Sequence, residues 1–318
     1  MHMVRDHGFF KSTEQKEDEL LKLRRLGISN DVEEIPAIEN EIGLRSLLLF
    51  HSYNLREHKI SILTSLKHLR VIVFRGIAIK RIPDSIGNLE QLRLLDLSYT
   101  KVQKLPESIG RLFSLEYFSV VGCLELQVLH VKGADAIRNI GAELLGRGVR
   151  MTLGSSTKVF PKIELLYIAD MPNWETWSLS TVGLCSQNTT GDTCQVILMP
   201  LLRRLSLLNC PKLRARPQDL HRAENLREVR IEGAHSLHEI VDLPVVVWLK
   251  VKHNQSLRRI ANLSKLEDLF AQDCPALDRA ENLGKLKRLD MVDCAKAEQF
   301  RRCLREQEPG SLIHFRTI

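Results

Sequence analysis

The sequence predicts a solenoid in which each turn of the chain adds one short parallel strand to a sheet. Three observations favour this fold class. The segments that begin at Leu66, Leu89 and Leu112 are evenly spaced along the chain, and their apolar residues are in register. Aromatic residues make up only 5% of the 318 residues, and leucine supplies most of the repeated apolar positions. The triplet Leu95-Asp96-Leu97 alternates apolar and polar residues, as a half-buried strand does.

The repeat extends over most of the chain, and one central apolar residue marks each predicted strand. The markers are Leu26, Leu47, Ile72, Leu95, Phe118, Leu166, Leu205, Val229, Leu249, Leu269 and Leu289. Successive markers are evenly spaced, except that the intervals on either side of Leu166 are nearly twice as long as the others. Such units are leucine-rich repeats. We therefore expect an α/β solenoid, a horseshoe with one parallel concave sheet and a convex side of irregular segments and short helices.

The ends of such a stack need caps, because a terminal turn leaves its core uncovered. We expect an N-terminal cap over residues 1–23, the solenoid over 24–295 and a C-terminal cap over 296–318. A Ser/Thr/Gly-rich stretch at about 178–198 predicts an exposed loop insertion. The C-terminal cap has a narrow apolar stripe at helical spacing, formed by Ala297, Phe300, Cys303, Leu304 and Gln307.

The region between Phe118 and Leu166 departs from the regular repeat. A further marker, Leu129, follows Phe118 after only about half of the length that a full turn needs. Either one of the two is not in a regular strand, or most of a repeat is missing between them. Residues 134–147 have apolar residues at helical spacing, and this pattern predicts a short helix.

Composition excludes several functional classes. No apolar run approaches the roughly 18 residues of a membrane span, and the start of the chain lacks the apolar stretch of a signal peptide. The expected location is therefore the cytoplasm or the nucleus. Seven cysteines without a CxxC or CxxxC pair argue against a disulfide framework and a zinc site. The 46 basic and 39 acidic residues interleave throughout, which argues against nucleic acid as a partner.

Catalytic and ligand-binding signatures are missing. The sequence contains no GxxxxGK[ST], GxGxxG, HExxH or GxSxG motif. We expect no enzyme activity, no cofactor, no metal and no small-molecule substrate. Four cysteines lie five residues after their markers, where we expect the thiol to donate to backbone groups of the neighbouring turn; they are Cys123, Cys210, Cys274 and Cys294.

The remaining candidates for function are strand residues that alternate with the core and face the concave side. The rear half carries basic and aromatic side chains: Arg204, Arg230, Trp248, Lys250, Lys252 and Phe270. The front half is apolar, with Leu48, Phe50, Val71, Val73, Leu94, Tyr117 and Val121. The rear residues predict a cationic strip that suits an acidic protein surface, and the apolar front predicts a partner of its own. The alternative is a solvated charged sheet with Trp248 packed on a neighbouring turn.

The chain resembles a known family at several places. These are the repeats IKRIPDSIGNLEQLRLLDLSYTKVQKLPESIGRLFSLEYFSVVGC, the stretch EIGLRSLLLF, the blocks LHVKGADAIRNIGAE and FPKIELLYIADMPNWETW, and the Cys-Pro-x-Leu turns at Cys210 and Cys274. They are similar to plant intracellular nucleotide-binding leucine-rich-repeat immune receptors of the coiled-coil type. The opening Met1-His2-Met3-Val4-Arg5-Asp6 resembles the Met-His-Asp motif that closes their nucleotide-binding module, with Met3 in place of the acidic residue.

The resemblance implies the C-terminal sensor and autoinhibitory half of such a receptor, without its phosphate loop. Its partner would be a protein: a pathogen effector, a guarded host protein or a receptor's switch domain. A general scaffold or a ubiquitin-ligase substrate adaptor is the alternative. An adaptor would predict an F-box-like helical module before the repeats, and the sequence shows none.

Overall fold

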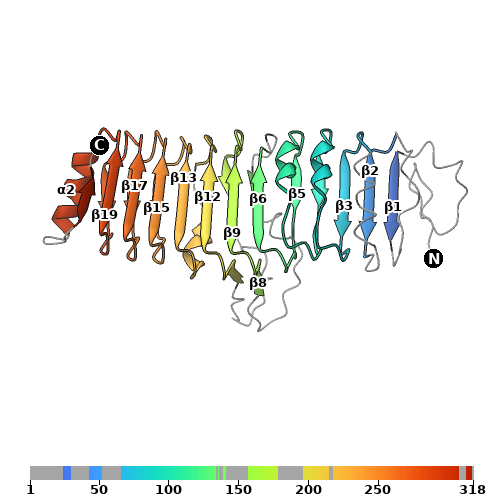
Figure 1. Ribbon diagram of the computed structural model, residues 1–318, viewed down its shortest axis with the longest axis horizontal. Helices are drawn as coiled ribbons and strands as arrows, with labels where there is room; N and C mark the ends of the chain where they lie inside the picture. The colour runs from blue at the N-terminus through green and yellow to red at the C-terminus, as the bar shows by residue number, and fades with distance from the viewer. Residues whose placement is uncertain are drawn as a thin grey trace, which may run out of the picture. The chain divides into compact units, whose positions relative to one another are not determined.

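The structure of the protein, a computed structural model, consists of two compact units. It describes residues 24–29, 43–51, 66–133, 135, 139–140, 157–177, 196–214, 218–307 and 313–316. The first unit comprises residues 1–137 and 143–149, and the second comprises 138–142 and 150–318. Within each unit, consecutive short strands lie side by side along a parallel sheet (Figure 1). The predicted cap over residues 1–23 and most of the predicted loop at 178–198 lie outside the described residues.

Five parallel strands form the main sheet of the first unit, in the order β1-β2-β3-β4-β5. Their bounds are Arg25–Ser29, Ser46–Phe50, Val71–Arg75, Leu94–Asp96 and Tyr117–Ser119. The predicted markers stand directly opposite one another, so that Leu47 pairs with Ile72 and Leu95 with Phe118. All five markers are buried. The predicted register of this unit is therefore confirmed.

Short 3-10 helices lie between these strands. They are η3 (Asp84–Asn88) and η4 (Glu107–Arg111). Each follows a proline, Pro83 or Pro106, whose φ of −68° or −70° is the value that the pyrrolidine ring imposes. The helices bury Ile86 and Ile109. They are the short returning helices that the sequence predicts for the first unit.

The short spacing between Phe118 and Leu129 has a geometric cause that the sequence analysis missed. Strand β6 (Val128–Lys132) does not lie beside β5; it begins at Val128, which bridges to Lys104, and Lys104 bridges to Arg81. Arg81 and Lys104 belong to the segment that leads from the end of one main strand back to the start of the next, which we call the returning segment. Both Phe118 and Leu129 are thus in strands, so the alternative in which one of them lies outside a strand is wrong.

The second unit contributes seven strands of an eight-stranded sheet, in the order β20-β19-β17-β15-β13-β12-β9. The bounds of β9, β12, β13, β15, β17, β19 and β20 are Leu165–Ala169, Arg204–Leu208, Glu228–Glu232, Trp248–Lys252, Asp268–Gln272, Arg288–Val292 and His314–Arg316. The markers again pair directly, as Val229 does with Leu249. The fold class is confirmed, but the main strands divide between two sheets where the sequence predicted one.

The returning segments of the second unit form a sheet, not the irregular segments and short helices that the sequence predicts. Strands β14 (Glu239–Val241), β16 (Arg259–Ala261) and β18 (Arg279–Glu281) pair in parallel. Because the turns here are equal in length, Ile240 and Ile260 fall in register and share the core. A single 3-10 helix is described among these turns, η5 (Gln218–Arg222).

Two small sheets complete the described strands of the second unit. They pair β10 (Thr176–Trp177) with β7 (Asn139–Ile140), and β11 (Val196–Leu198) with β8 (Thr157–Val159). The short helix predicted over residues 134–147 is wrong at Asn139 and Ile140, because strand pairing with Thr176 and Trp177 overrides the helical spacing there. The rest of that predicted helix is undescribed, apart from a turn at residue 135.

Helix α2 (Ala297–Gln307) packs against β18 near the C-terminal end of the second unit (Figure 1). Phe300 and Leu304 are its buried residues. The Gln307 side chain donates to the Ala280 carbonyl at 2.6 Å and accepts from the Asn282 N–H at 3.0 Å. These bonds satisfy backbone groups that a following turn would otherwise pair.

A residue with positive φ follows most main strands. In the second unit these positions hold Asn209, His253, Asp273 and Asp293, with φ between 49° and 52°. Asn and Asp tolerate the left-handed conformation better than other residues with a Cβ. In the first unit, Gly122 has a φ of 64°, and a Cβ there would lie 2.6 Å from the ring of Tyr99. Glycine is therefore required because the Tyr99 ring lies over it.

Candidate functional site

The predicted rear residues lie on the face of the second unit's main sheet that points away from its core. We call this the outer face; it comprises the first, third and fifth residues of β12, β13, β15, β17 and β19. Ser206, Arg230, Lys250 and Phe270 form one row, each pairing with the next. Arg204, Glu228 and Trp248 begin the row beside it. The intervening residues are buried, as the alternation requires.

Strands β15 and β17 bring an aromatic and cationic cluster together on this face. The Nζ atoms of Lys250 and Lys252 each lie 5.5 Å from the centroid of the Phe270 ring, within the range of a cation–π contact. Trp248 is half-buried and stands opposite Asp268. A hollow of about 300 Å³ lies among Trp248, Lys250, Asp268, Leu269, Phe270, Arg288 and Asp290.

Carboxylates neutralise much of the positive charge of the cluster. The guanidinium of Arg230 donates to both carboxylate oxygens of Glu232, at 2.8 and 3.0 Å, and Lys250 Nζ lies 3.6 Å from the same carboxylate. Burial alone raises the pKa of Glu232, but the hydrogen bonds and charge of Arg230, with the charges of Lys250 and Lys252, lower it below its ordinary value. Glu232 is therefore ionised at neutral pH.

Other basic residues of the outer face are paired in the same way. Arg204 Nε lies 2.9 Å from Glu228, and Arg288 binds the Asp268 carboxylate through two nitrogens. The face has five basic residues, Arg204, Arg230, Lys250, Lys252 and Arg288, and four acidic ones, Glu228, Glu232, Asp268 and Asp290. The predicted cationic strip is thus close to neutral. Its charges are arranged in pairs around the half-buried side chains of Trp248 and Phe270.

The predicted front residues belong to the first unit. Phe50 is on β2, Val73 on β3 and Tyr117 on β5, so the structure spreads them over the sheet instead of gathering them. Phe50 and Val73 are half-buried, and Tyr117 is 37% exposed. Val121, which the sequence places on this face, is 6% exposed and belongs to the core. The reason is that β5 ends at Ser119, so the strand alternation stops before Val121.

The four cysteines are free thiols in the turns after their strands, as predicted, and they contact neighbouring turns: Cys210 bonds the backbone of Met171, and Cys274 bonds Asn254 and Cys294. Cys123 Sγ donates to the Leu97 carbonyl at 3.0 Å. The other three donate to the carbonyl two residues earlier, for example Cys210 to Leu208 at 3.3 Å. Burial raises the pKa of Cys210 to about 12. Such a thiol is protonated and unreactive at neutral pH.

Asn254 occupies the same position in its turn as these cysteines, and the sequence analysis missed it. It is fully buried, accepts from the Ala234 N–H at 2.9 Å and donates to the Ile231 carbonyl at 3.0 Å. Its side chain therefore joins two adjacent turns. The signal was available, because Asn254 lies five residues after its marker Leu249 just as Cys274 does after Leu269.

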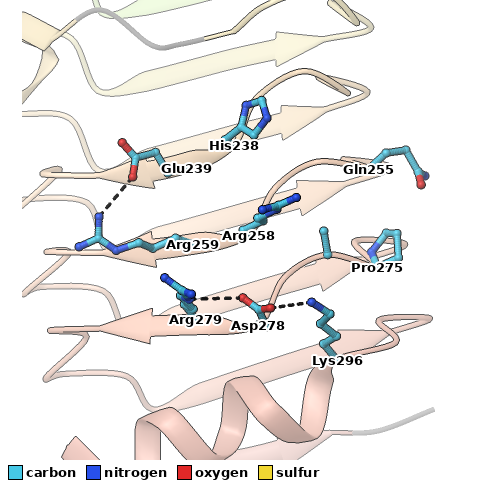
Figure 2. A pocket seen from close by; sticks show the side chains of 10 residues that line it. His238, Glu239, Gln255, Arg258, Arg259, Pro275, Asp278, Arg279 and Lys296 are labelled. Carbon is cyan, nitrogen blue, oxygen red and sulfur yellow. Dashed lines mark hydrogen bonds and ion pairs between the residues drawn. The ribbon is translucent and has the colours of Figure 1, made fainter.

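A larger hollow, of about 730 Å³, lies beside the returning strands β14, β16 and β18. Figure 2 shows its lining. Arg259 is bound to Glu239 at 3.2 Å, and it also binds Glu281 at 2.6 Å. Lys296 and Arg279 share Asp278, at 2.6 and 3.9 Å. Most of the cations in this hollow are therefore held by neighbouring carboxylates, as on the outer face.

Two searches of the described residues gave negative results. No group of three or more His, Cys, Asp or Glu side chains in that part of the chain is arranged to hold a metal ion. No helix within it has the length and apolar character needed to cross a membrane.

Comparison with known proteins supports the repeat fold. Residues 19–135 match a profile of leucine-rich repeat regions. A search of curated proteins found no significant match. Among solved structures, a leucine-rich-repeat protein of Leptospira interrogans is 14% identical, with a TM-score of 0.29, 98% of this chain covered and 100% of that one.

Two further structures come from another bacterium and from a plant. An internalin of Listeria monocytogenes is 13% identical, with a TM-score of 0.32, 83% of this chain covered and 88% of that one. The ectodomain of the plant membrane receptor kinase GASSHO1/SCHENGEN3 from Arabidopsis thaliana is 14% identical, with a TM-score of 0.26, 85% of this chain covered and 46% of that one. At these TM-scores the likenesses carry no argument about the fold or the function. The matched repeat region and the stacked parallel strands show that the chain has a leucine-rich-repeat fold.

Proposed function

We propose that the outer face of the second unit is the recognition surface of this leucine-rich-repeat interaction module. One observation carries the proposal: Trp248 and Phe270 stand half-buried on adjacent strands, with Lys250 and Lys252 against the Phe270 ring. Tryptophan and arginine are enriched in the residues that dominate binding energy. Because the surrounding charges are paired, the surface fits a partner with mixed charges and an apolar anchor better than a purely acidic one.

The biological role that we propose is the sensor and autoinhibitory part of a plant immune receptor, acting in the cytoplasm or nucleus during the defence response. The support is the resemblance of the repeats and of the block from Leu126 to Trp177 to coiled-coil-type receptors. The partner would be a pathogen effector, a guarded host protein or the switch domain of a receptor. No catalytic family was found, in keeping with a binding role.

The test is affinity capture from infected and uninfected plant tissue with wild-type chain and two double variants. Trp248→Ala with Lys250→Ala removes the anchor, and Lys265→Ala with Lys285→Ala changes two exposed turn lysines as the control. A captured protein is then purified and titrated. Loss of the anchor should weaken its binding by about 2 kcal/mol or more, roughly 30-fold, with an unchanged circular dichroism spectrum.

The proposal fails if the anchor variant is folded and binds its partner as wild type does. That result would move the interface to the first unit, around Phe50, Val73 and Tyr117. Capture of ubiquitin-ligase subunits in place of immune components would support the adaptor role instead.

A further inference from the structure

Four arginines occupy the same position in four consecutive turns of the first unit, two residues before each marker. We call Arg24, Arg45, Arg70 and Arg93 the arginine ladder. Each is joined to the next through the backbone, with N–H to carbonyl distances of 2.8, 2.7 and 2.8 Å. All four side chains are exposed. Adjacent strands of a sheet are about 4.8 Å apart, so the ladder extends over about 14 Å along the stack.

Three of the four arginines of the ladder have no charged partner among the residues that the structure describes. Arg93 lies 3.4 Å from Glu116, which follows it at the same position of the next turn. Arg24, Arg45 and Arg70 form no ion pair or side-chain hydrogen bond within the described part of the chain. Like charges on adjacent strands repel one another. Within the described residues, the ladder is therefore an electrostatic cost that the pairing of Arg93 with Glu116 offsets only in part.

The second unit shows that the fold does not require arginine here. The equivalent positions hold Glu164, Arg203, Arg227, Val247, Glu267 and Lys287, and they make the same backbone bonds. Their charges alternate or are satisfied: Lys287 Nζ lies 2.8 Å from Glu267, and Arg227 donates to two backbone carbonyls at 3.1 Å. The run of arginines is thus a property of the first unit and not of the solenoid.

An apolar surface borders the ladder. Val71 and Leu94 directly follow Arg70 and Arg93 on strands β3 and β4, and both are half-buried. Leu48 and Val73 pair in the next row of the same face. Asp96 follows Val73 in the same row, and its carboxylate is hydrogen-bonded to the backbone N–H and the hydroxyl of Ser98. A partner that covers this face and the edge where the strands begin therefore meets aliphatic side chains on the face and arginine side chains at the edge.

The spacing of the ladder selects among acidic partners. Carboxylates one turn apart on an α-helix, at i and i+4, are about 5–6 Å apart. Alternate residues on one side of an extended strand are about 6.6 Å apart. The helix spacing is therefore closer than the strand spacing to the distance of about 4.8 Å between successive arginines of the ladder. We propose that the arginine ladder and the apolar surface formed by Leu48, Val71, Val73 and Leu94 dock an acidic amphipathic helix of a partner protein. This surface is separate from the outer face of the second unit and does not depend on its proposed function.

The test uses a defined probe, since the partner is not identified. A fluorescent helical peptide carries glutamates one turn apart beside a leucine stripe, and a second peptide has lysine in place of each glutamate. We expect the glutamate peptide to bind wild-type chain with an affinity that falls as salt is added. Arg45→Glu with Arg70→Glu should weaken its binding at least tenfold in anisotropy titrations. Arg203→Glu with Lys285→Glu makes the same change of net charge in the second unit and should stay within twofold.

Several results would overturn the proposal: equal binding of the two peptides, equal loss in both charge-reversed variants, or no binding of the glutamate peptide to wild-type chain. Tighter binding of duplex DNA or of phosphatidylserine vesicles would also overturn it, by assigning the ladder to another class of partner. Trp248→Ala with Lys250→Ala should bind the glutamate peptide as wild type does, which separates this test from that of the proposed function.

A second measurement needs no ligand. Arg45→Gln with Arg70→Gln relieves the repulsion along the ladder, so the urea midpoint should stay unchanged or rise. A fall in the midpoint would show that the arginines stabilise the fold, and would remove the reason for assigning them to binding.

Discussion

At the scale of single residues, Asp96 shows how an outward strand position acquires a structural role. Alternation alone predicts that Asp96→Ala is nearly neutral, within about 0.5 kcal/mol. The structure corrects this, because the Asp96 carboxylate accepts from the Ser98 N–H at 2.8 Å and Ser98 is only 3% exposed. We expect Asp96→Ala to lower the free energy of unfolding by about 1–3 kcal/mol in urea denaturation, since it leaves a buried donor unsatisfied.

The matched control for Asp96 is Asp96→Asn. Its amide oxygen keeps an acceptor for the Ser98 N–H, so the loss of stability should be smaller than for alanine. If the two variants lose the same amount, the hydrogen bond is not the cause.

The second residue-scale prediction concerns Asn254. Its side chain bonds the Ala234 N–H and the Ile231 carbonyl, both in the preceding turn. Asn254→Ala leaves both groups without a partner and should lower the free energy of unfolding by about 2–4 kcal/mol. Gln255→Ala changes an exposed neighbour and should cost less than about 0.5 kcal/mol. A result in which Asn254→Ala is as mild as Gln255→Ala would mean that water replaces the lost bonds.

The sequence predicted where these side chains stand but not what they bind. A spacing of five residues after the marker located Cys123, Cys210, Cys274 and Cys294 in their turns. The carbonyl that each thiol bonds could not be predicted from this spacing, because it differs between turns. Cys123 follows two three-residue strands and reaches Leu97, whereas Cys210 follows a five-residue strand and bonds to Leu208.

At the scale of elements, replacing Leu97 tests whether buried residues just outside a strand contribute as much stability as those within it. It lies one residue beyond β4 and is fully buried. Leu97→Ala should lower the free energy of unfolding by about 2–5 kcal/mol, because neighbouring turns close only partly around the cavity. Urea denaturation measures it, with Lys101→Ala as an exposed control in the same turn. A loss below about 1 kcal/mol would mean that the turn collapses around the smaller side chain.

Main strands were predictable because apolar residues recur at nearly equal intervals and so fall in register, but the returning segments were not. LQVLHV around Leu129 has the same alternation as a main strand, but within the first unit its residue Val128 bridges to Lys104 and not to β5. Period-2 patterning reports that one side of a strand is buried, not which ladder it joins. Likewise, Asn139 and Ile140 are strand because of their pairing with β10, which comes much later in the chain.

At the scale of the whole molecule, net charge says little about where charge is available. The chain has a formal charge of +7, and the basic residues of the outer face were predicted as a cationic strip. Pairing with Glu228, Glu232 and Asp268 removes most of that charge locally. In the first unit, by contrast, Arg24, Arg45 and Arg70 stand in consecutive turns and have no ion pair within the described residues. Row positions can be read from a repeat, but ion pairs depend on rotamers and distances between strands.

The last prediction concerns how far a defect spreads. In a stack, each turn contacts mainly its neighbours, so destabilisation should decline with distance along the repeat. In hydrogen exchange under native conditions, Leu97→Ala should speed exchange of the amides in β3, β4 and β5 while leaving β15, β17 and β19 close to wild type. Leu249→Ala, at a fully buried marker of the second unit, should give the reverse pattern. Faster exchange throughout the chain in both variants would instead show that the two compact units unfold as one cooperative block.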